Sequence, residues 1–551
     1  MPRAPRGAKR GARSAGRTGR GGFSVRRLAM VLALAVLLAG GSLAARTLVR
    51  APGSVNGANA DRVQTVHAGS PSPPLFVPLA DTAAAASSHA PLPMAGTGTS
   101  PASSALLAQS LQQPFLSGVV EGFYGTPWSL SATQAVLGVM QQAGMNAFVY
   151  APKADPYARS KWNVLYPSSN LSQLSGMVQA AQSRHITFVY SLSPGLSIVY
   201  SNPTDRAELL AKIQQIEGIG VHTFMLSFDD TPATLSSPAD IAAYPNGLGE
   251  AQSSLTNWLL GKLGPSHVRL LFTPTEYYGL TNGPYWEALH QYLAPGIDVL
   301  WTGPNVLSSS ITSTEAETFA HDVGHPVMVW DNYPVNDYTY QIQHAPRLFL
   351  GPLRNRGTTL PSVLSGYFAN PMIQPLASEV ALLTVGAYLA HPGTYNPAVS
   401  WSSAVTEVGV GAESSFRLLA EDASSSFLTG GQSMSPLPPA MAAYWNTPSS
   451  TTTTALQAQF TAMAGASSAL SSLSMPGLYG EIKPWAAELS AEGQDGLDAL
   501  TLLADAQNGS STSQALSTVE ADITALKSPP VVLDTTAPVL NFLEQAVNTG
   551  G

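Results

Sequence analysis

Two adjacent acids, Asp229 and Asp230, end the apolar stretch FMLSFDD, and they are the clearest candidates for chemistry in the sequence. Successive side chains on a regular strand point to opposite faces, so both acids can reach one site only where a strand ends in a loop. An acid pair can also cap a helix or occupy a surface loop. A catalytic interpretation of the pair therefore depends on which structural elements surround it.

Adjacent acids favour one class of reaction. An ordinary retaining glycosidase uses carboxyl groups about 5 Å apart on opposite sides of the sugar carbon, which neighbouring residues suit poorly. Adjacent acids are better suited to a substrate that supplies its own nucleophile, as an N-acetylated amino sugar can through its acetamido oxygen. One aspartate would hold the acetamido N–H as a carboxylate, and the other would protonate the leaving oxygen. Repulsion between close carboxylates helps to keep one of them protonated.

The elements that would position these acids are short apolar runs, each followed by a loop and then by helical spacing, which predicts a parallel α/β fold. Eight candidate strands suggest a TIM (β/α)8 barrel: SGVVEGFY, NAFVYAP, ITFVYSLSP, HTFMLSFDD, VRLLFTPTEY, IDVLWTGP, PVMVWDNYP and SGYFANP. Polar residues follow each run at its C-terminal end, where barrels hold their active sites. The stretch RLFLGPL, Arg347–Leu353, could replace or precede the last strand.

The stretch VEGFYGTPWS, Val120–Ser129, begins as a strand and breaks at glycines and a proline. Shaped loops of this kind commonly hold ligands, although a turn with aromatic packing is the alternative.

Composition excludes several functions. The 551 residues carry a net charge of -8, and nine of the 26 Lys and Arg precede Leu28, so the remainder is strongly acidic and a nucleic-acid partner is not expected. No cysteine is present, which excludes disulfides and thiolate metal sites.

The N-terminus predicts export. Residues 1–27 form a basic n-region, and the uncharged run 28–45 is about 27 Å long as a helix, which suits a cleaved signal peptide or a retained membrane anchor. Both interpretations place the rest outside the cell, secreted or anchored. Residues 46–115, rich in Pro, Ser and Ala, are predicted to be a disordered linker. The barrel is expected over 116–400 and an all-α helical domain over 401–551, where a Ser/Thr tract, Thr447–Thr454, should separate two helical segments.

The motifs GVVEGFYGTPWS, YAPKADPY, LSFDD, PTEY, WTGP and VWDNYPVNDY resemble the catalytic barrel of glycoside hydrolase family 84. This family includes β-N-acetylglucosaminidases such as protein O-GlcNAcases and bacterial enzymes labelled hyaluronidases. The resemblance covers roughly Leu116 to Trp401, and a helical domain also follows the barrel in the family. It implies a retaining exo-β-N-acetylglucosaminidase that uses substrate-assisted catalysis through an oxazoline intermediate and acts on N-acetylglucosamine-containing glycans or glycoproteins.

The resemblance also implies residue roles. Asp229 would orient and polarise the acetamido nitrogen, and Asp230 would be the general acid and later the general base. Seven further residues would bind the sugar: Gly122 and Lys153 at hydroxyls, Tyr277 and Trp330 around the acetamido pocket, Asp337 at the hydroxyls on O4 and O6, and Asn332 and Asn370 in the polar lining.

Some features depart from this pattern or lie outside it. The family commonly has Lys-Asp-Asp where this chain has Lys153, Ala154 and Asp155, which bears on the loop rather than on the assigned chemistry. Glu121 and Glu276 are interpreted as supporting or structural groups. His321 and His325 are four apart, but Gly324 between them argues against a helical metal site, and no cofactor motif occurs. No metal and no cofactor are therefore expected.

Two other functions stay open at this stage. A cell-surface glycan-binding protein would keep the pocket without turnover, and an endo-acting hydrolase of hyaluronan, chitin or peptidoglycan would need an open cleft. The sequence leaves the natural glycan and the oligomeric state undetermined.

Overall fold

The structure is a computed structural model that describes residues 113–265 and 267–550. The predicted n-region, signal or anchor segment and nearly all of the predicted linker lie outside the described residues. Among the described helices, none combines the length and the apolar character that a membrane crossing requires.

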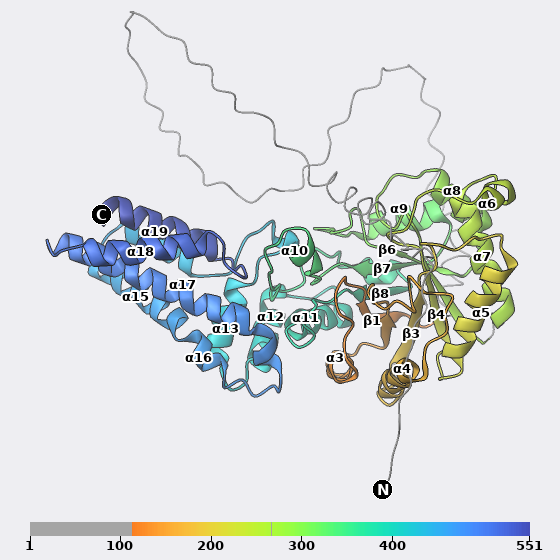
Figure 1. The fold of residues 1–551 in the computed structure, drawn as a ribbon, viewed down its shortest axis with the longest axis horizontal. Coiled ribbons are helices and arrows are strands. Elements are labelled where there is room, and N and C mark those ends of the chain that lie inside the picture. Colours follow the sequence, from red (N-terminus) through yellow and green to blue (C-terminus); the bar gives the residue numbers. More distant parts are fainter. Residues whose placement is uncertain (1–112, 266, 551) are drawn as a thin grey trace, which may run out of the picture. The chain divides into compact units, whose positions relative to one another are not determined.

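Eight parallel strands close into a barrel in chain order, because β1 pairs with both β2 and β8 (Figure 1). The strands are β1 (Leu116–Glu121), β2 (Ala147–Tyr150), β3 (Thr187–Leu192), β4 (Thr223–Ser227), β5 (Arg269–Thr273), β6 (Asp298–Trp301), β7 (Val327–Asp331) and β8 (Gly366–Ala369). The predicted TIM barrel is confirmed. The last strand is the SGYFANP segment, whereas Arg347–Leu353 contains no strand.

Alternate positions of the strands face the barrel interior, as the two-residue period of a strand requires. One buried cluster collects these inward side chains: Leu116, Val120, Ala147, Val149, Ala151, Val189, Met225, Leu271, Leu300, Met328, Trp330 and Phe368. The intervening side chains, such as Val119 and Phe148, belong to the larger core beneath the surrounding helices. The strands are therefore apolar on both faces, which explains why their sequences lack a polar alternation.

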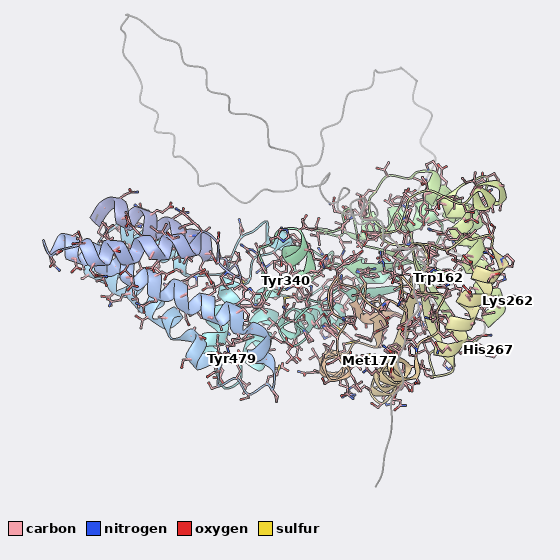
Figure 2. All side chains as sticks on the ribbon, viewed as in Figure 1. Trp162, Met177, Lys262, His267, Tyr340 and Tyr479 are labelled. Carbon is pink, nitrogen blue, oxygen red and sulfur yellow. The ribbon has the colours of Figure 1, made fainter. Side chains whose placement is uncertain are left out.

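Helices connect and cover the strands. They are α3 (Leu130–Gln142), α4 (Ser168–Gln182), α5 (Pro203–Glu217), α6 (Pro238–Ala243), α7 (Leu248–Leu263), α8 (Pro284–Tyr292), α9 (Ser313–Val323), α10 (Asp337–Gln341) and α11 (Glu379–Ala390). Local sequence sets their starts: Thr312 and Glu315 form a capping box at α9, and Asn202 caps α5 at Thr204 N. Tyr340 of α10, labelled in Figure 2, accepts a hydrogen bond from Gln374 after β8.

The C-terminal region is helical, as predicted. Its helices are α12 (Pro397–Val408), α13 (Glu413–Asp422), α14 (Leu437–Asn446), α15 (Ser450–Ala464), α16 (Ala466–Leu470), α17 (Leu478–Gln507), α18 (Ser513–Leu526) and α19 (Thr536–Gly550). The Ser/Thr tract separates two helices, α14 and α15, as predicted, but only part of it forms the break. Only Thr447–Ser449 breaks the helices, because Ser449 forms a capping box with Thr452 and the remaining residues of the tract begin α15.

Candidate active site

The carboxyl ends of the strands bring the predicted site residues together. Most of them keep the inward phase of their strand. Trp330 lies within β7, and the others lie past the last residue of their strand: Gly122, Lys153, Asp229, Tyr277, Asn332 and Asn370. Asp230 is out of phase, and it is one of the few non-glycine residues with positive φ, at 53°. This left-handed conformation breaks the alternation, which is how two consecutive acids can serve one site.

Asp229 is buried and forms an ion pair with Lys153 through Oδ2. Its other oxygen, Oδ1, is buried without a hydrogen-bond partner among the described residues. Burial acts to raise the pKa of Asp229, but the charges of Lys153 and Arg159 outweigh burial and hold this pKa below its ordinary value. Asp229 is therefore an ionised acceptor with one oxygen left for a donor such as an amide N–H.

Asp230 is exposed, and neutral donors hold its carboxylate. Tyr124 donates to Oδ2 at 2.8 Å and Tyr277 donates to Oδ1 at 2.9 Å. Burial, followed by the charge on Asp230, raises the pKa of both tyrosines, so both hydroxyls keep their protons. Arg159 donates to the main-chain oxygen of Asp230 at 3.0 Å. The two acids thus have different surroundings, a cation for Asp229 and hydroxyls for Asp230.

Trp330 forms a wall beside Lys153, whose ammonium lies 5.1 Å from the centre of the indole ring. A Cβ atom on Gly122 would lie 2.1 Å from Cζ2 of Trp330. In the structure the missing side chain of Gly122 makes room for the tryptophan. This contact is with a residue 208 positions along the chain, which no local pattern reveals. The approach of a sugar hydroxyl to the backbone of Gly122 stays a prediction.

The two asparagines form a hydrogen-bonded link across the barrel mouth. Asn332 Oδ1 accepts from Trp330 Nε1 at 3.0 Å and from Asn370 Nδ2 at 2.9 Å. Asn370 Oδ1 in turn accepts from Gly122 N at 3.2 Å. In this structure the two asparagines hold the Trp330 indole and the loop after β1 in place.

Asp337 lies in the first turn of α10, and its two oxygens accept the backbone N–H groups of Tyr124 and Tyr338, both at 2.7 Å. Burial raises the pKa of Asp337, and the charge of Asp230 adds to the effect. This carboxylate therefore lies close to the acid pair and joins α10 to the loop after β1.

Further buried acids support these loops. Glu121 Oε1 accepts from Trp128 N at 2.7 Å, and burial raises the pKa of Glu121 to about 8. Asp155 accepts from the hydroxyls of Tyr150 and Tyr166, at 2.8 and 2.6 Å, which fixes the loop that carries Lys153. Glu276 is exposed, and desolvation of its carboxyl group still raises its pKa. These contacts agree with the structural interpretation of Glu121.

In the part of the chain that the structure describes, no cluster of three possible metal ligands occurs. His321 lies in α9, and His325 follows the C-cap Gly324. Burial lowers the pKa of His325 to about 4, so this imidazole is a neutral core group.

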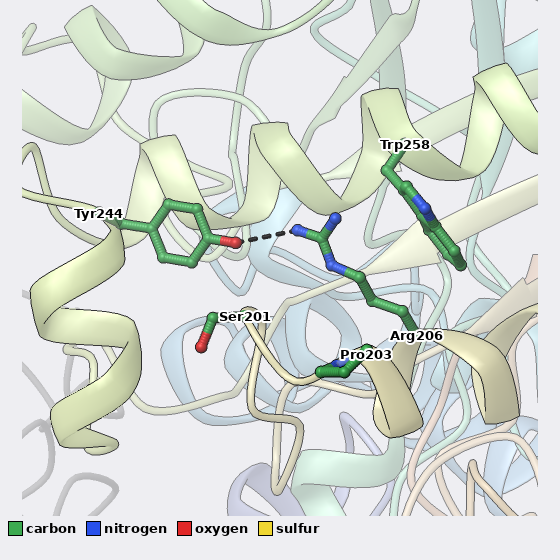
Figure 3. A pocket seen from close by; sticks show the side chains of 5 residues that line it. All are labelled: Ser201, Pro203, Arg206, Tyr244 and Trp258. Carbon is green, nitrogen blue, oxygen red and sulfur yellow. Dashed lines mark hydrogen bonds between the residues drawn. The ribbon is translucent and has the colours of Figure 1, made fainter.

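A separate cavity of ≈ 390 Å³ lies between the start of α5 and α7, lined by Ser201, Pro203, Arg206, Tyr244 and Trp258 (Figure 3). Arg206 donates to Tyr244 at 2.9 Å and to the main-chain oxygen of Tyr200 at 2.8 Å, and its guanidinium lies over the Trp258 ring. None of the predicted site residues lines this cavity. The arginine acts there as a bridge between elements.

Sequence reasoning missed two residues that touch the acid pair, Tyr124 and Arg159. Tyr124 lies in the VEGFYGTPWS stretch, so the shaped loop was a usable signal for it. Arg159 follows Lys153 by six residues and gives no local signal, because its partner is a carbonyl group 71 positions away.

As a whole, the site offers an ionised acceptor, a second carboxyl group held by hydroxyls, a lysine, amides and an indole face. Hydroxyl-binding polar groups beside a flat aromatic surface suit a sugar. The acid pair suits cleavage of a bond next to an N–H-bearing substituent.

Comparison with known proteins agrees with this geometry. A family model described as beta-N-acetylglucosaminidase matches residues 117–421. The protein O-GlcNAcases of Rattus norvegicus and Mus musculus are each 36% identical to this chain over 280 residues, which is 50% of this chain and 30% of those proteins. The chain thus matches less than a third of the length of these curated relatives.

Solved structures extend the similarity into the helical region. A mutant of the Thermobaculum terrenum O-GlcNAc hydrolase superposes with a TM-score of 0.70 at 29% sequence identity, covering 78% of this chain and 94% of that one. The structure titled CpGH84B superposes with a TM-score of 0.67 at 25% identity, covering 78% of this chain and 76% of that one.

Proposed function

This chain belongs to the beta-N-acetylglucosaminidase family, glycoside hydrolase family 84, and on that premise we propose that it removes terminal β-linked N-acetylglucosamine from glycoconjugates with retention of configuration. The observation that carries the proposal is the unequal pair at the barrel mouth. Asp229 is held ionised with one oxygen unpartnered, and Asp230 is held by two hydroxyls.

In the first step the acetamido oxygen forms a bond to the anomeric carbon while the bond to the leaving oxygen breaks. The leaving oxygen takes the proton of Asp230. Asp229 accepts the acetamido N–H through Oδ1 and stabilises the positive charge that develops on the amide, since a preorganised carboxylate is strongest where charge appears in the transition state. The product of this step is an oxazolinium ion, the protonated form of the oxazoline, whose N–H stays hydrogen-bonded to Asp229.

In the second step water bonds to the anomeric carbon and gives its proton to Asp230, while the bond to the acetamido oxygen breaks. Two inversions at one carbon restore the original configuration. Asp337 supports exo action within this proposal. If its carboxylate binds the hydroxyls on O4 and O6, a further sugar linked through O4 is excluded from that side.

The proposal is tested with paired aryl glycosides. Aryl β-N-acetylglucosaminide should be hydrolysed, whereas the matching β-glucoside, which lacks the internal nucleophile, should not. A thiazoline that mimics the oxazoline should inhibit tightly. Binding of N-acetylglucosamine without any turnover would instead favour a glycan-binding protein, and internal cleavage of oligosaccharides would contradict exo action.

Export is a further part of the proposal, supported by the basic residues 1–27 and the apolar run 28–45. Cell fractionation with mass spectrometry of the N-terminus would show whether the protein leaves the cytosol and whether it is cleaved. Recovery in the cytosol alone would contradict this part.

A further inference from the structure

Arg159 comes from the loop between β2 and α4, and it contacts the main chain of Asp230 rather than its carboxylate. Its side chain is buried, and its Nη2 atom donates to the main-chain oxygen of Asp230 at 3.0 Å. Its guanidinium lies 5.7 Å from the ring centre of Tyr124, which also donates to Asp230. Arg159 forms no salt bridge with any carboxylate among the described residues.

The contact falls on the one residue of the site whose backbone needs support. Asp230 has φ of 53°, a conformation that residues with side chains rarely adopt unless the surroundings fix it. Tyr124 and Tyr277 hold its carboxylate, and Arg159 holds its carbonyl group. This hydrogen bond therefore supports the main chain of Asp230 at the point where its φ is unusual.

The same guanidinium acts on Asp229 by its charge. The groups that surround Asp229 are Lys153 and Arg159 from the loop after β2, Asp230 next in the chain, Tyr124 after β1 and Tyr277 after β5. Burial opposes the ionised form of Asp229, and Lys153 and Arg159 both lower its pKa. Because Arg159 contacts Asp230 through a neutral carbonyl oxygen, it does not fix the Asp230 carboxylate as an ion-pair partner.

Resting on the proposed function, we propose that Arg159 is a positioning residue that aims Asp230 at the leaving oxygen while its charge supports ionised Asp229. One side chain would thus serve both acids, by geometry for one and by charge for the other.

Two conservative variants separate these effects. Arg159→Lys keeps the charge and loses the planar donor group, and Arg159→Gln keeps an N–H donor and loses the charge. Arg184→Gln is the matched control, because Arg184 also donates to a main-chain oxygen, that of Ala180 at 3.0 Å, but outside the site. Each variant is assayed for kcat/KM on aryl β-N-acetylglucosaminides with good and poor leaving groups, across pH, with thermal melting as the check on folding.

Arg159→Lys should lower kcat/KM by about 10- to 100-fold on poor leaving groups and much less on good ones, because only poor ones need a well-aimed proton. Arg159→Gln should shift the acidic limb of the pH profile upward, whereas Arg184→Gln should change neither. Equal losses on all substrates with an unmoved acidic limb would overturn the inference. Failure of the wild-type protein to hydrolyse any of these glycosides would instead contradict the proposed function itself.

Discussion

At the residue scale, the site separates two chemically identical side chains by what surrounds them. Lys153 forms an ion pair with Asp229, and hydroxyls from Tyr124 and Tyr277 hold Asp230. A cation favours the charged form of a carboxyl group, whereas neutral donors do so less strongly. This difference supports the proposed acceptor role of Asp229 and the proposed proton-transfer role of Asp230.

Removing the proposed acid should affect substrates unequally. Asp230→Ala is expected to lower kcat/KM on poor leaving groups by about 10²- to 10⁴-fold, the usual contribution of general acid catalysis, and far less on good leaving groups. Steady-state kinetics on an aryl series measures this. Glu520→Ala, at an exposed position of α18, is the control that should change nothing. A uniform loss would speak against Asp230 as the acid.

Gly122 gives a second test at this scale. Gly122→Ala should push Trp330 out of place and destabilise the fold by about 1–3 kcal/mol, because the added Cβ would lie 2.1 Å from the indole. The matched control is Gly138→Ala in α3, where nothing lies within 4 Å and alanine should stabilise by about 0.5–1 kcal/mol. Chemical denaturation and the KM of an aryl glycoside report both effects. A neutral Gly122→Ala would show that Trp330 is not held where the structure places it.

The residues that sequence reasoning found and missed follow a physical division. Asp229, Trp330 and Asn332 lie at or just past a strand end, where a local pattern is visible. The contact of Arg159 with Asp230 and the packing of Trp330 against Gly122 depend on distant parts of the chain. A pattern along one sequence shows which residues leave a strand but not which partners they meet.

At the element scale, the strands were predictable because each apolar run is long enough to be buried on both faces and ends at a recognisable loop. The helical region was predictable as helices but not at its boundaries. The Ser/Thr tract has the composition of a loop. However, Ser449 caps α15, and the residues from Ser450 onward form the first turn of that helix. Capping side chains and loop side chains are the same residue types, so composition alone cannot separate them.

Helix α17 buries several acids against the other C-terminal helices. Burial raises the pKa of Glu492 to about 8 and those of Glu488 and Asp495 to about 7. Glu492 is fully buried and accepts from the hydroxyls of Thr535 and Thr536. The folded protein thus keeps these protons at pH values where the unfolded chain has released them.

This predicts a stability that falls as pH rises. Below about pH 4.5 both states hold the Glu492 proton, and between that value and about 8 only the folded state does. The free energy of unfolding therefore falls as pH rises through this range. Glu492→Gln, which stays neutral, should lose less stability between pH 5 and 8, by about 1 kcal/mol or more. Thermal and denaturant unfolding across pH measure this, with exposed Glu520→Gln as control. Identical pH dependence in Glu492→Gln and wild type would refute the buried-acid explanation.

At the scale of the whole molecule, the C-terminal helical region contacts the segment that follows α10. The contact is made by Asp534, between α18 and α19, with Arg347. Asp534 pairs with Arg347 at 3.1 Å and accepts from Ser425 N at 2.8 Å. The main-chain oxygen of Arg347 accepts from Asn336, the residue before Asp337. A series of hydrogen bonds and an ion pair therefore joins the helical region to the start of α10, where Asp337 is predicted to bind the sugar.

Removing these contacts should lower the free energy of unfolding more than it lowers kcat/KM. Asp534→Ala removes a carboxylate whose side chain is buried and has several partners, and it should destabilise by about 1–3 kcal/mol. The dependence of kcat/KM on the leaving group should be unchanged, because neither acid is touched. Unfolding measurements beside the aryl-glycoside series separate the two effects. A changed leaving-group dependence would mean that the helical region takes part in the chemistry.

The central claim is that the acetamido oxygen of the substrate is the nucleophile, guided by Asp229 and Asp230. Its most direct test is kcat/KM on aryl glucosaminides whose N-acetyl group carries increasing numbers of fluorine atoms, since fluorine withdraws electrons from the amide oxygen. The account predicts a steep, progressive fall in kcat/KM along this series with the leaving group held constant. A kcat/KM that is independent of fluorination would contradict it.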